Sequence, residues 1–567
     1  MRLRNSYSKQ GKFLYHILFL LLICCDVAAG TDRAPDQSAI ASSSPLATRA
    51  GAEILRQGGN AFDAAAAMTA VLAVVEPYAA GLGGGGLWLI HRASDGKQVL
   101  IDGRETAPEL AHRHLYLDAH GRLKRNVTVD GPLAAAIPGT PAAIVHLALD
   151  YGRLPLSKTL QPAIEYAEKG FVVDDRYRLL AVLRKADLKK YSASGNFLDH
   201  GEIPATGYRI KQQGLADVIK SLARLGAAGF YKGEVAASLV NDINKHGGDW
   251  TLNDLANYRI KERAPLVFTY HDMRVVTAPP PSAGGVVLGQ AMKILEHFDL
   301  RAMDQVSRMH YIIEAMRRGF RDYAVYLGDP DFVDVPVARL LAPDYLDGLA
   351  ETIDADKATP SGVLGDTPGP PRAGMQTTHF SIIDAQGNRV AGTLSINSIF
   401  GSAFVAGKTG ILLNNAMNDF VITGNSAVAG RAGRAADSLQ PGKRPMTSMT
   451  PTFLETKNRL AVLGTPGGNR IISIMLLAAL DFSEGEPLQD WIKKPRYHQQ
   501  YMPDVVEFEH NGLSFAIQRK LHDMGYKLRE APGTFGDLQV VIWDKQFNRV
   551  YAASDPRGDG QARLILP

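Results

Sequence analysis

The sequence contains almost no cysteine, because its 567 residues include only Cys24 and Cys25, which are adjacent and near the start. A fold built on disulfide bonds needs cysteines spread along the chain, so the sequence excludes such a framework. The fifteen histidines are scattered, and none has the close spacing of a zinc site. We therefore expect no metal ion and no other cofactor.

An excess of charge of either sign is also missing. Lys and Arg number 62, Asp and Glu number 58, and the formal net charge is +4. Four basic residues and one acidic residue lie in the first thirty, so the remainder is near +1. Because nucleic-acid-binding surfaces are rich in Lys and Arg, we expect no nucleic-acid partner. A hydrophobic share of 46% with 21% charged residues is typical of a globular chain with a large core.

The first thirty residues have the composition of a signal peptide. A basic start is followed by an apolar run from Phe13 to Cys25 and by the small residues Val27 to Gly30. The run is shorter than the roughly 20 residues of a transmembrane helix, so we expect cleavage near Ala29 and export to the periplasm or the medium. An uncleaved anchor or a lipidated cysteine is the alternative, although no small residue precedes Cys24.

Periodicity predicts mixed helices and strands. A helix is expected to begin at Ser44-Pro45, a second from Ala61 to Val75 is almost entirely small or apolar, and Ser307 to Tyr326 predicts another, with His310 packed inside. The glycine run Gly81 to Gly86 lies between a helix and a strand. Because a nucleotide-binding loop lies between a strand and a helix, we interpret this run as a tight turn with close backbone packing.

The stretch from Gly374 to Asn397 predicts a β-hairpin. Apolar and polar residues alternate on both sides of residues 384–388, which have the composition of a turn. Thr377 lies at the leading edge of this hairpin. The preceding residues 360–376, rich in Gly and Pro, predict a flexible linker.

Two interpretations of Thr377 follow from its position. Strands favour threonine, and its hydroxyl can simply satisfy a neighbouring backbone group. Alternatively, the chain is cut between Gln376 and Thr377, and the new α-amino group acts as the general base for the Thr377 hydroxyl. A flexible linker immediately before Thr377 is what such an intramolecular cleavage needs.

Several motifs favour the second interpretation. They are Gln376-Thr-Thr-His-Phe-Ser381, Leu394-Ser-Ile-Asn397, Gly407-Lys-Thr-Gly-Ile-Leu-Leu-Asn-Asn-Ala-Met-Asn-Asp-Phe420, Lys443-Arg-Pro-Met-Thr-Ser-Met-Thr-Pro451 and Gly464-Thr-Pro-Gly-Gly468. In these motifs and their order the chain resembles the γ-glutamyltransferase (glutathione hydrolase) family. The resemblance covers nearly the whole chain after the first forty residues, so it is far more specific than one short motif.

The resemblance implies an α+β fold, the N-terminal-nucleophile hydrolase sandwich, in which two stacked β-sheets lie between layers of helices. It implies a large subunit of residues 31–376 and a small subunit of residues 377–567, cleaved from one precursor and held together as a heterodimer. It also implies hydrolysis of glutathione and related γ-glutamyl compounds, or transfer of the γ-glutamyl group to amino acids or peptides, through a γ-glutamyl-Thr377 intermediate.

The resemblance also implies the catalytic residues. Thr377 is the expected nucleophile and, after cleavage, its own base. Ser395 matches the position of a second threonine that hydrogen-bonds the nucleophile, and its hydroxyl preserves that role. Gly467 and Gly468, whose backbone N–H groups can approach a ligand closely, are the expected oxyanion hole.

A second set of residues is implied for substrate binding. Arg104 matches the residue that grips the substrate's α-carboxylate, helped by the hydroxyls of Thr447 and Ser448. Asn397 and Asp419 match the residues that hold the α-amino group, and Asp419 supplies the opposite charge.

The chain departs from the family pattern at two places. Ala416 stands where the family typically has Gln or Glu contacting the α-amino group, and such a contact is worth about 1.5–3 kcal/mol. Residues 421–440, where some bacterial members have a lid with a tyrosine, contain no tyrosine. Both departures predict a more open pocket that favours water as the acceptor.

Two alternatives to this function stay open. One is an acylase of the same fold acting on a glutaryl-type or other acyl amide, although such a substrate would leave Asp419 unpaired. The other is an uncleaved binding protein, which the presence of Thr377, Ser395 and Gly467-Gly468 disfavours.

Overall fold

The structure is a computed structural model of the continuous chain, and it describes residues 34–122, 124, 126–191, 194–365, 376–422 and 436–566. The predicted signal peptide, residues 366–375 of the predicted linker and residues 423–435 of the expected lid lie outside these ranges. Within the described ranges, no helix has the length and apolar character needed to cross a bilayer.

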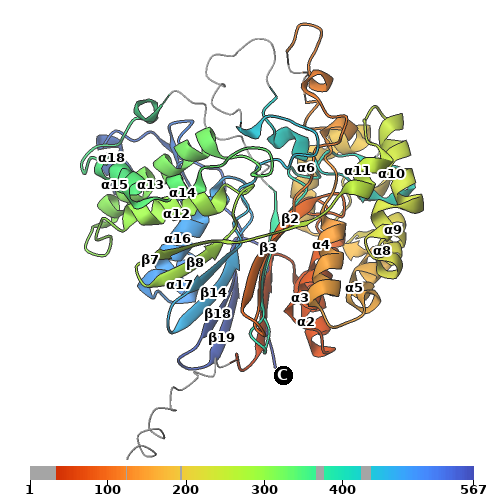
Figure 1. The fold of residues 1–567 in the computed structure, drawn as a ribbon, viewed down its shortest axis with the longest axis horizontal. Coiled ribbons are helices and arrows are strands. Elements are labelled where there is room, and N and C mark those ends of the chain that lie inside the picture. Colours follow the sequence, from red (N-terminus) through yellow and green to blue (C-terminus); the bar gives the residue numbers. More distant parts are fainter. Residues whose placement is uncertain are drawn as a thin grey trace, which may run out of the picture.

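Two β-sheets stacked face to face form the centre of the molecule (Figure 1). All strand pairs within these two sheets are antiparallel. The first has the order β20-β1-β9-β10-β2-β3-β6, and the second has the order β19-β18-β14-β13-β8-β7. Their strands are β1 (Ser38–Ser42), β2 (Gly85–Arg92), β3 (Lys97–Gly103), β6 (Lys261–Arg263), β7 (Leu266–Tyr270), β8 (Met273–Thr277), β9 (Thr378–Ile383), β10 (Arg389–Ser395), β13 (Thr452–Glu455), β14 (Arg459–Gly464), β18 (Gln539–Asp544), β19 (Arg549–Ser554) and β20 (Gln561–Ile565).

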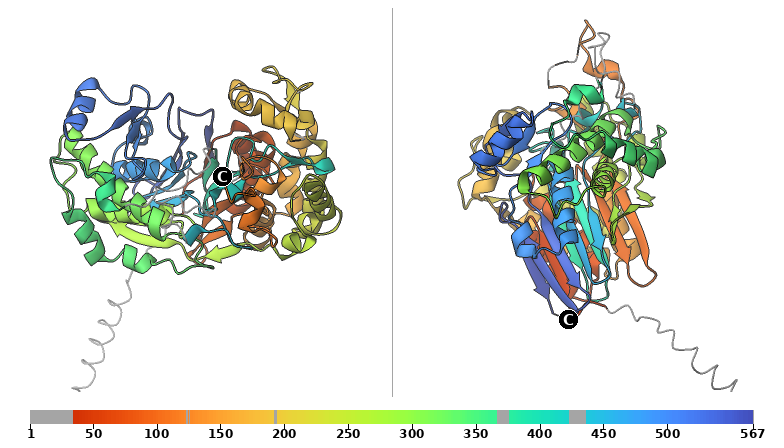
Figure 2. Two further views of the ribbon diagram at one scale, coloured as in Figure 1. Left: turned by 90° about the horizontal axis from the view of Figure 1, so that it is seen from above. Right: turned by 90° about the vertical axis from the view of Figure 1, so that its left-hand side faces the viewer.

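Helices lie on the outer side of each sheet, as Figure 1 and the left view of Figure 2 show. On the first sheet lie helices from the first half of the chain: α2 (Pro45–Arg56), α3 (Ala61–Val75), α4 (Thr140–His146), α5 (Leu156–Lys169), α6 (Asp175–Lys190), α7 (Ser194–Phe197), α8 (Gln213–Leu225), α9 (Ala228–Tyr231), α10 (Gly233–Lys245) and α11 (Leu252–Asn257). On the second sheet's side lie α12 (Gly284–Leu295), α13 (Gln305–Tyr326), α14 (Val337–Leu340), α15 (Pro343–Glu351), α16 (Arg470–Glu484), α17 (Leu488–Trp491) and α18 (Phe515–Asp523).

Three apolar cores separate these layers. Between the sheets, inward residues such as Leu89, Ala391 and Val462 pack together. A larger core joins the first sheet to its helices, and another joins the second sheet to α12, α13 and α16. Because each sheet is apolar on both faces, it needs both a partner sheet and a helical layer, and the predicted four-layer α+β sandwich is confirmed.

Residues near each end of α3 explain where this helix begins and why glycines follow it. The side chain of Asn60 accepts from the Asp63 N–H while the Asp63 side chain accepts from the Asn60 N–H, a capping box that begins α3 where predicted. All its residues are buried. After α3, a Cβ at Gly83 would lie 2.1 Å from the Leu412 carbonyl oxygen, which confirms the predicted close backbone packing.

The predicted hairpin is confirmed as β9 and β10, with Gly392 paired to Phe380. The Asp384 carboxylate accepts from two backbone N–H groups of the turn and fixes the register. Along β9, Phe380 and Ile382 belong to the core under α3, while His379 faces Gly464 of the second sheet. The hairpin therefore fixes the direction in which Thr377 enters the sandwich.

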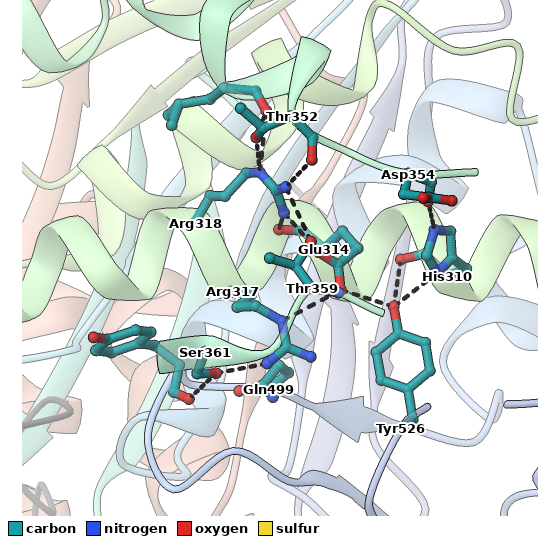
Figure 3. Close-up of polar contacts among 12 residues, drawn as sticks. His310, Glu314, Arg317, Arg318, Thr352, Asp354, Thr359, Ser361, Gln499 and Tyr526 are labelled. Carbon is teal, nitrogen blue, oxygen red and sulfur yellow. Dashed lines mark hydrogen bonds and ion pairs between the residues drawn. The ribbon is translucent and has the colours of Figure 1, made fainter. Parts of the chain in front are cut away.

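The segment before the predicted linker is anchored by a buried ionic cluster on α13 (Figure 3). Glu314 accepts from Arg318 Nη1 at 2.7 Å, from Tyr526 Oη at 2.9 Å and from the backbone N–H of Thr359 at 3.2 Å. The Ser361 hydroxyl accepts from Arg317 Nη1 at 2.6 Å and donates to the Tyr501 carbonyl.

This anchoring shortens the predicted linker. Ser361–Leu364 forms a 3-10 turn whose Ser361 is fully buried, so the prediction of a linker from residue 360 was wrong for this part. Composition missed it because the partners of the turn come from α13 and from residues 501–504. His310 is packed as predicted, with Nε2 2.7 Å from the Asp354 carbonyl oxygen and Nδ1 2.8 Å from Tyr526 Oη.

Candidate active site

Thr377 lies at the entrance to β9, where the chain passes from the linker into the sheet. Thr377 is 5% exposed, and its Oγ1 has no hydrogen-bond partner among the described residues. A buried hydroxyl without a partner costs free energy, and such groups in native structures often mark functional positions.

Ser395 lies at the end of β10, opposite the peptide bond that precedes Thr377. Its hydroxyl donates to the Gln376 carbonyl oxygen at 2.9 Å and accepts from the Asn397 backbone N–H at 2.7 Å. The second bond fixes the direction of the hydroxyl. Ser395 therefore polarises the carbonyl of the bond between Gln376 and Thr377.

Asn397 turns the chain sharply after β10, with a φ of 76° that asparagine tolerates better than most residues. Its side-chain amide donates to the Asn415 carbonyl oxygen and to Asp419 Oδ1, both at 3.0 Å. The hairpin end is thereby tied to the 3-10 turn Ala416–Asp419, and two of the predicted α-amino-binding residues lie in direct contact.

Asp419 also contacts Arg104, which follows β3. Arg104 Nη2 donates to Asp419 Oδ2 at 2.9 Å, while Arg104 Nη1 donates to Glu105 Oε2 at 2.7 Å. All three side chains are buried. Burial raises the pKa of Asp419 to about 6, although the neighbouring Arg104 favours its ionised form.

Glu105 is a neighbour that the sequence analysis did not identify. Burial raises the pKa of its carboxyl, opposed by the charge of Arg104. It accepts from Nη1 of Arg104, while Asp419 accepts from Nη2. Its position directly after Arg104 was a signal, because a buried guanidinium usually has a carboxylate partner.

The predicted hydroxyl pair is joined to Arg104 through the backbone. Arg104 Nη2 also donates to the Met446 carbonyl oxygen at 3.0 Å, immediately before Thr447 and Ser448. The Ser448 hydroxyl donates to Asn469 Oδ1 at 2.8 Å, and the Thr447 hydroxyl accepts from the Met449 N–H at 3.2 Å. The link from Ser448 to Asn469 leads directly to the glycine pair.

Gly467 and Gly468 precede α16 with φ angles of 140° and 58°, which favour glycine. Their carbonyls accept from the Arg470 and Ile471 N–H groups at the start of the helix. A helix N-terminus favours a negative charge near it. The oxyanion site at Gly467 and Gly468 stays a prediction that this position is compatible with.

Ala416 is fully buried in an apolar cluster with Met417 and Phe420. Its methyl group leaves Asn397 and Asp419 as the polar groups that the structure places at the predicted α-amino position. The loss of a contact there, and the effect of the lid, stay predictions, since residues 423–435 lie outside the described ranges.

The hydrogen bonds thus connect the predicted residues from five segments into one site. Continuous contacts run from the Gln376 carbonyl through Ser395, Asn397, Asp419 and Arg104 to the backbone before Ser448, and from Ser448 to the segment of Gly467-Gly468. Over the described residues, no three His, Cys, Asp or Glu side chains form a group that could hold a metal ion. The arrangement brings together a buried hydroxyl without a hydrogen-bond partner among the described residues, a hydrogen-bonded carbonyl and a buried ion pair.

Comparison with known sequences and structures finds relatives that match most of the chain. The sequence pattern of the gamma-glutamyltranspeptidase family matches residues 47–565. A glutathione hydrolase proenzyme from Pseudomonas sp. (strain A14) is 38% identical over 527 residues, covering 90% of this chain and 91% of that protein. Acylase ACY 1 proenzyme from Pseudomonas sp. (strain V22) is 34% identical over 516 residues, 89% of each. The crystal structure of a cephalosporin acylase from Bacillus halodurans has a TM-score of 0.81 at 28% identity, covering 94% of this chain and 96% of that one.

Proposed function

We propose, since the chain belongs to the gamma-glutamyltranspeptidase family of enzymes, that it is a precursor that cuts itself before Thr377 and then hydrolyses or transfers γ-glutamyl groups. Its substrates would be glutathione and related γ-glutamyl compounds, with water, amino acids or peptides as acceptors. Large and small subunits of residues 31–376 and 377–567 would stay together as a heterodimer, and the precursor would be exported by the segment 1–30.

Strand pairing between the two parts supports a heterodimer that stays assembled after cleavage. β9 and β10 of the small subunit lie between β1 and β2 of the large subunit in one sheet. In the second sheet, β13 of the small subunit pairs with β8 of the large subunit. Because both sheets contain paired strands from the two subunits, cutting one peptide bond would leave the sheets and the core intact.

Cleavage would begin with attack of Thr377 Oγ1 on the carbonyl carbon of Gln376. The peptide nitrogen of Thr377 takes a proton and leaves, and an ester then joins Gln376 to Thr377 Oγ1. Water hydrolyses the ester, which leaves a carboxylate on Gln376 and a free amino group on Thr377. The 2.9 Å bond from Ser395 to the Gln376 carbonyl oxygen supports this step, since it stabilises the charge that develops there.

Turnover would use the new amino group of Thr377 as base. It takes the hydroxyl proton as Oγ1 attacks the γ-carbonyl carbon of the substrate, and the N–H groups of Gly467 and Gly468 hold the developing oxyanion. The leaving amine takes that proton as the C–N bond breaks. Water or an acceptor amine then attacks the γ-glutamyl ester and releases Thr377.

Donor recognition would exchange one ion pair for two. In the structure, Arg104 and Asp419 neutralise each other at 2.9 Å. A γ-glutamyl group carries an α-carboxylate and an α-ammonium, which can pair with Arg104 and Asp419 respectively, with Asn397, Thr447 and Ser448 beside them. A ligand with only one of these charges leaves one protein charge buried without a partner, which is costly.

The observation that carries this proposal is the buried Thr377 hydroxyl beside a Gln376 carbonyl held by Ser395. The test is to incubate purified protein with glutathione and to quantify glutamate, cysteinylglycine and, with glycylglycine added, γ-glutamylglycylglycine. We expect glutamate from the wild type and none from Thr377→Ala. Equal, negligible release by both proteins would contradict the proposed activity.

An acylase is the second candidate, because a relative that is 34% identical is named an acylase proenzyme. A glutaryl group lacks the α-ammonium, so Asp419 would be left buried without its partner. We therefore expect glutaryl-p-nitroanilide to be cleaved at least 100-fold more slowly than γ-glutamyl-p-nitroanilide. A preference for the glutaryl compound would favour the acylase instead.

A further inference from the structure

We propose that a small cavity beside Gly467 and Gly468 binds the leaving group of the γ-glutamyl substrate, and equally the acceptor, through a carboxylate on that group. The proposal rests on the proposed function and adds to it the residues that bind the second portion of the substrate. The cavity has a volume of about 200 Å³, and its lining includes Gly467, Gly468, Asn469, Arg470, Glu507 and Arg529.

The cavity continues from the proposed oxyanion site but lies apart from the donor residues. Gly467 and Gly468 belong to its wall, whereas Arg104, Asn397 and Asp419 do not. When the donor carbonyl oxygen points at the glycine N–H groups, the γ-glutamyl side of the amide extends towards Arg104 and Asp419. The leaving amine must extend elsewhere, and this cavity is the space that shares the oxyanion glycines.

Asn469 joins the two spaces. Its Oδ1 accepts from the Ser448 hydroxyl at 2.8 Å, and its Nδ2 donates to Gln500 Oε1 at 3.3 Å. Gln500 Oε1 also lies 3.0 Å from Nε2 of the buried His498. One hydrogen-bonded chain thus forms a wall from the donor residues to the cavity, so substrates bound on its two sides would be held in fixed relation.

The charge of the cavity is positive. The Glu507 carboxylate is shared by Arg470, whose Nη2 lies 2.7 Å from Oε2, and by Arg529, which contacts Oε1. Burial lowers the pKa of His498 to about 4, so its imidazole is neutral at neutral pH. Two guanidiniums facing one carboxylate leave a net positive charge, which favours an anionic ligand.

The volume of the cavity limits the size of the ligand that it can bind. Pockets for drug-sized molecules have about 300–1,000 Å³, so a cavity of about 200 Å³ suits one or two amino-acid residues. An amino acid or dipeptide joined through its amine to the γ-glutamyl group ends in a carboxylate within this distance. The cavity therefore fits leaving groups and acceptors of this class better than uncharged amines.

The test compares two donors that differ only in this carboxylate, γ-glutamylglycine and γ-glutamylglycinamide, by the kcat/KM for glutamate release. We expect the wild type to prefer γ-glutamylglycine roughly tenfold, the effect of one charge-assisted contact. Arg470→Gln and Arg529→Gln should each lower this ratio several-fold, and the double variant should bring it near one.

Glu507→Gln should change the ratio of the two kcat/KM values in the opposite direction. Removing the carboxylate that occupies both guanidiniums should raise the preference for γ-glutamylglycine above that of the wild type, which a merely structural role would not do. Arg549→Gln, the same loss of charge at an exposed position of β19, is the matched control and should leave the ratio unchanged.

The outcomes separate this proposal from the proposed function. If both donors are cleaved with equal kcat/KM and no cavity variant alters the ratio, the cavity proposal is wrong while γ-glutamyl hydrolysis stands. If neither donor is cleaved by a protein that is folded and cut before Thr377, the proposed function fails and this proposal with it.

Discussion

Two arginine clusters border the candidate site and differ in burial and in net charge. Arg104 is buried between Asp419 and Glu105, with its side chain 2% exposed. Arg470 and Arg529 share the single carboxylate of Glu507, and the Arg529 side chain is 54% exposed. The first cluster has more carboxylates than guanidiniums, and the second has the reverse.

This difference in burial predicts how strictly each arginine cluster selects the charges of its ligand. A buried ion pair that is opened by a ligand must be replaced by equally good contacts, because an unpaired buried charge costs several kcal/mol. Exposed pairs are worth only about 0–1 kcal/mol, since water competes with them. The Arg104 side should therefore demand both charges of an α-amino acid, and the Arg470 side should tolerate many carboxylates.

The largest effect is expected from Arg104. Arg104→Gln leaves Asp419 and Glu105 buried without their cation, so we expect a kcat/KM for γ-glutamylglycine at least 100-fold below wild type and about 3–5 kcal/mol less stability. Arg104→Lys keeps the charge but not the two-pronged grip, and should fold with a smaller loss of both. Steady-state kinetics and thermal denaturation measure the two effects.

Arg529→Gln is the comparison for this prediction. Its effect on the same kcat/KM should be several-fold at most, and its midpoint of thermal denaturation should match the wild type. Equal losses for Arg529→Gln and Arg104→Lys would contradict the contrast between the two clusters.

The cluster in Figure 3 allows the effect of burying a charged residue to be distinguished from the effect of its position at the site. Glu314 is as buried as Asp419, but its partners Arg317 and Arg318 hold the segment before the linker. Glu314→Gln should lower the stability by about 3 kcal/mol, since the buried guanidinium of Arg318 loses its carboxylate while Arg317 keeps only Asp504. The donor preference of the folded enzyme should be unchanged, and a shift in the ratio for glycine against glycinamide donors would contradict the assignment of this preference to residues at the site.

The pH dependence of the KM for the donor should show the ionisation of Asp419. Burial raises its pKa to about 6, and only its ionised form attracts the α-ammonium of the donor. The KM for the donor should therefore rise as the pH falls below about 6, by up to about tenfold per pH unit. In Asp419→Asn this inflection should disappear while those of other groups stay, and an unchanged inflection would assign it elsewhere.

The smallest effect is expected from Ser395. Ser395→Ala removes the 2.9 Å hydrogen bond to the Gln376 carbonyl oxygen, and a single neutral hydrogen bond is worth about 1 kcal/mol. Cleavage before Thr377 should slow about fivefold. Ser395→Thr keeps the hydroxyl and should cleave at the wild-type rate, as followed by gel electrophoresis over time.

Sequence patterns predicted the local elements well. The helix from Ala61 to Val75 and the hairpin on either side of residues 384–388 agree with the structure because their apolar periodicity and turn residues are local signals. The stacking of the two sheets came from the family resemblance, since pairing of distant strands leaves no local signal. The 3-10 turn at Ser361 was missed for the same reason, because its partners lie on α13 and beyond residue 500.

The site was predicted unevenly for a physical reason. Arg104 and Asp419 were identified through the family resemblance, and the structure places them in contact. Glu105 has no motif of its own. The cluster of Arg470, Glu507 and Arg529 combines residues from separate segments that only folding brings together.

The most direct test of the account is the intact mass and N-terminal sequence of the purified wild-type protein and of Thr377→Ala. The account predicts two chains for the wild type, the smaller beginning Thr377-Thr-His-Phe, and one uncut chain for the variant. A wild-type chain that stays uncut after prolonged incubation would contradict it and would make the pocket a binding site without chemistry.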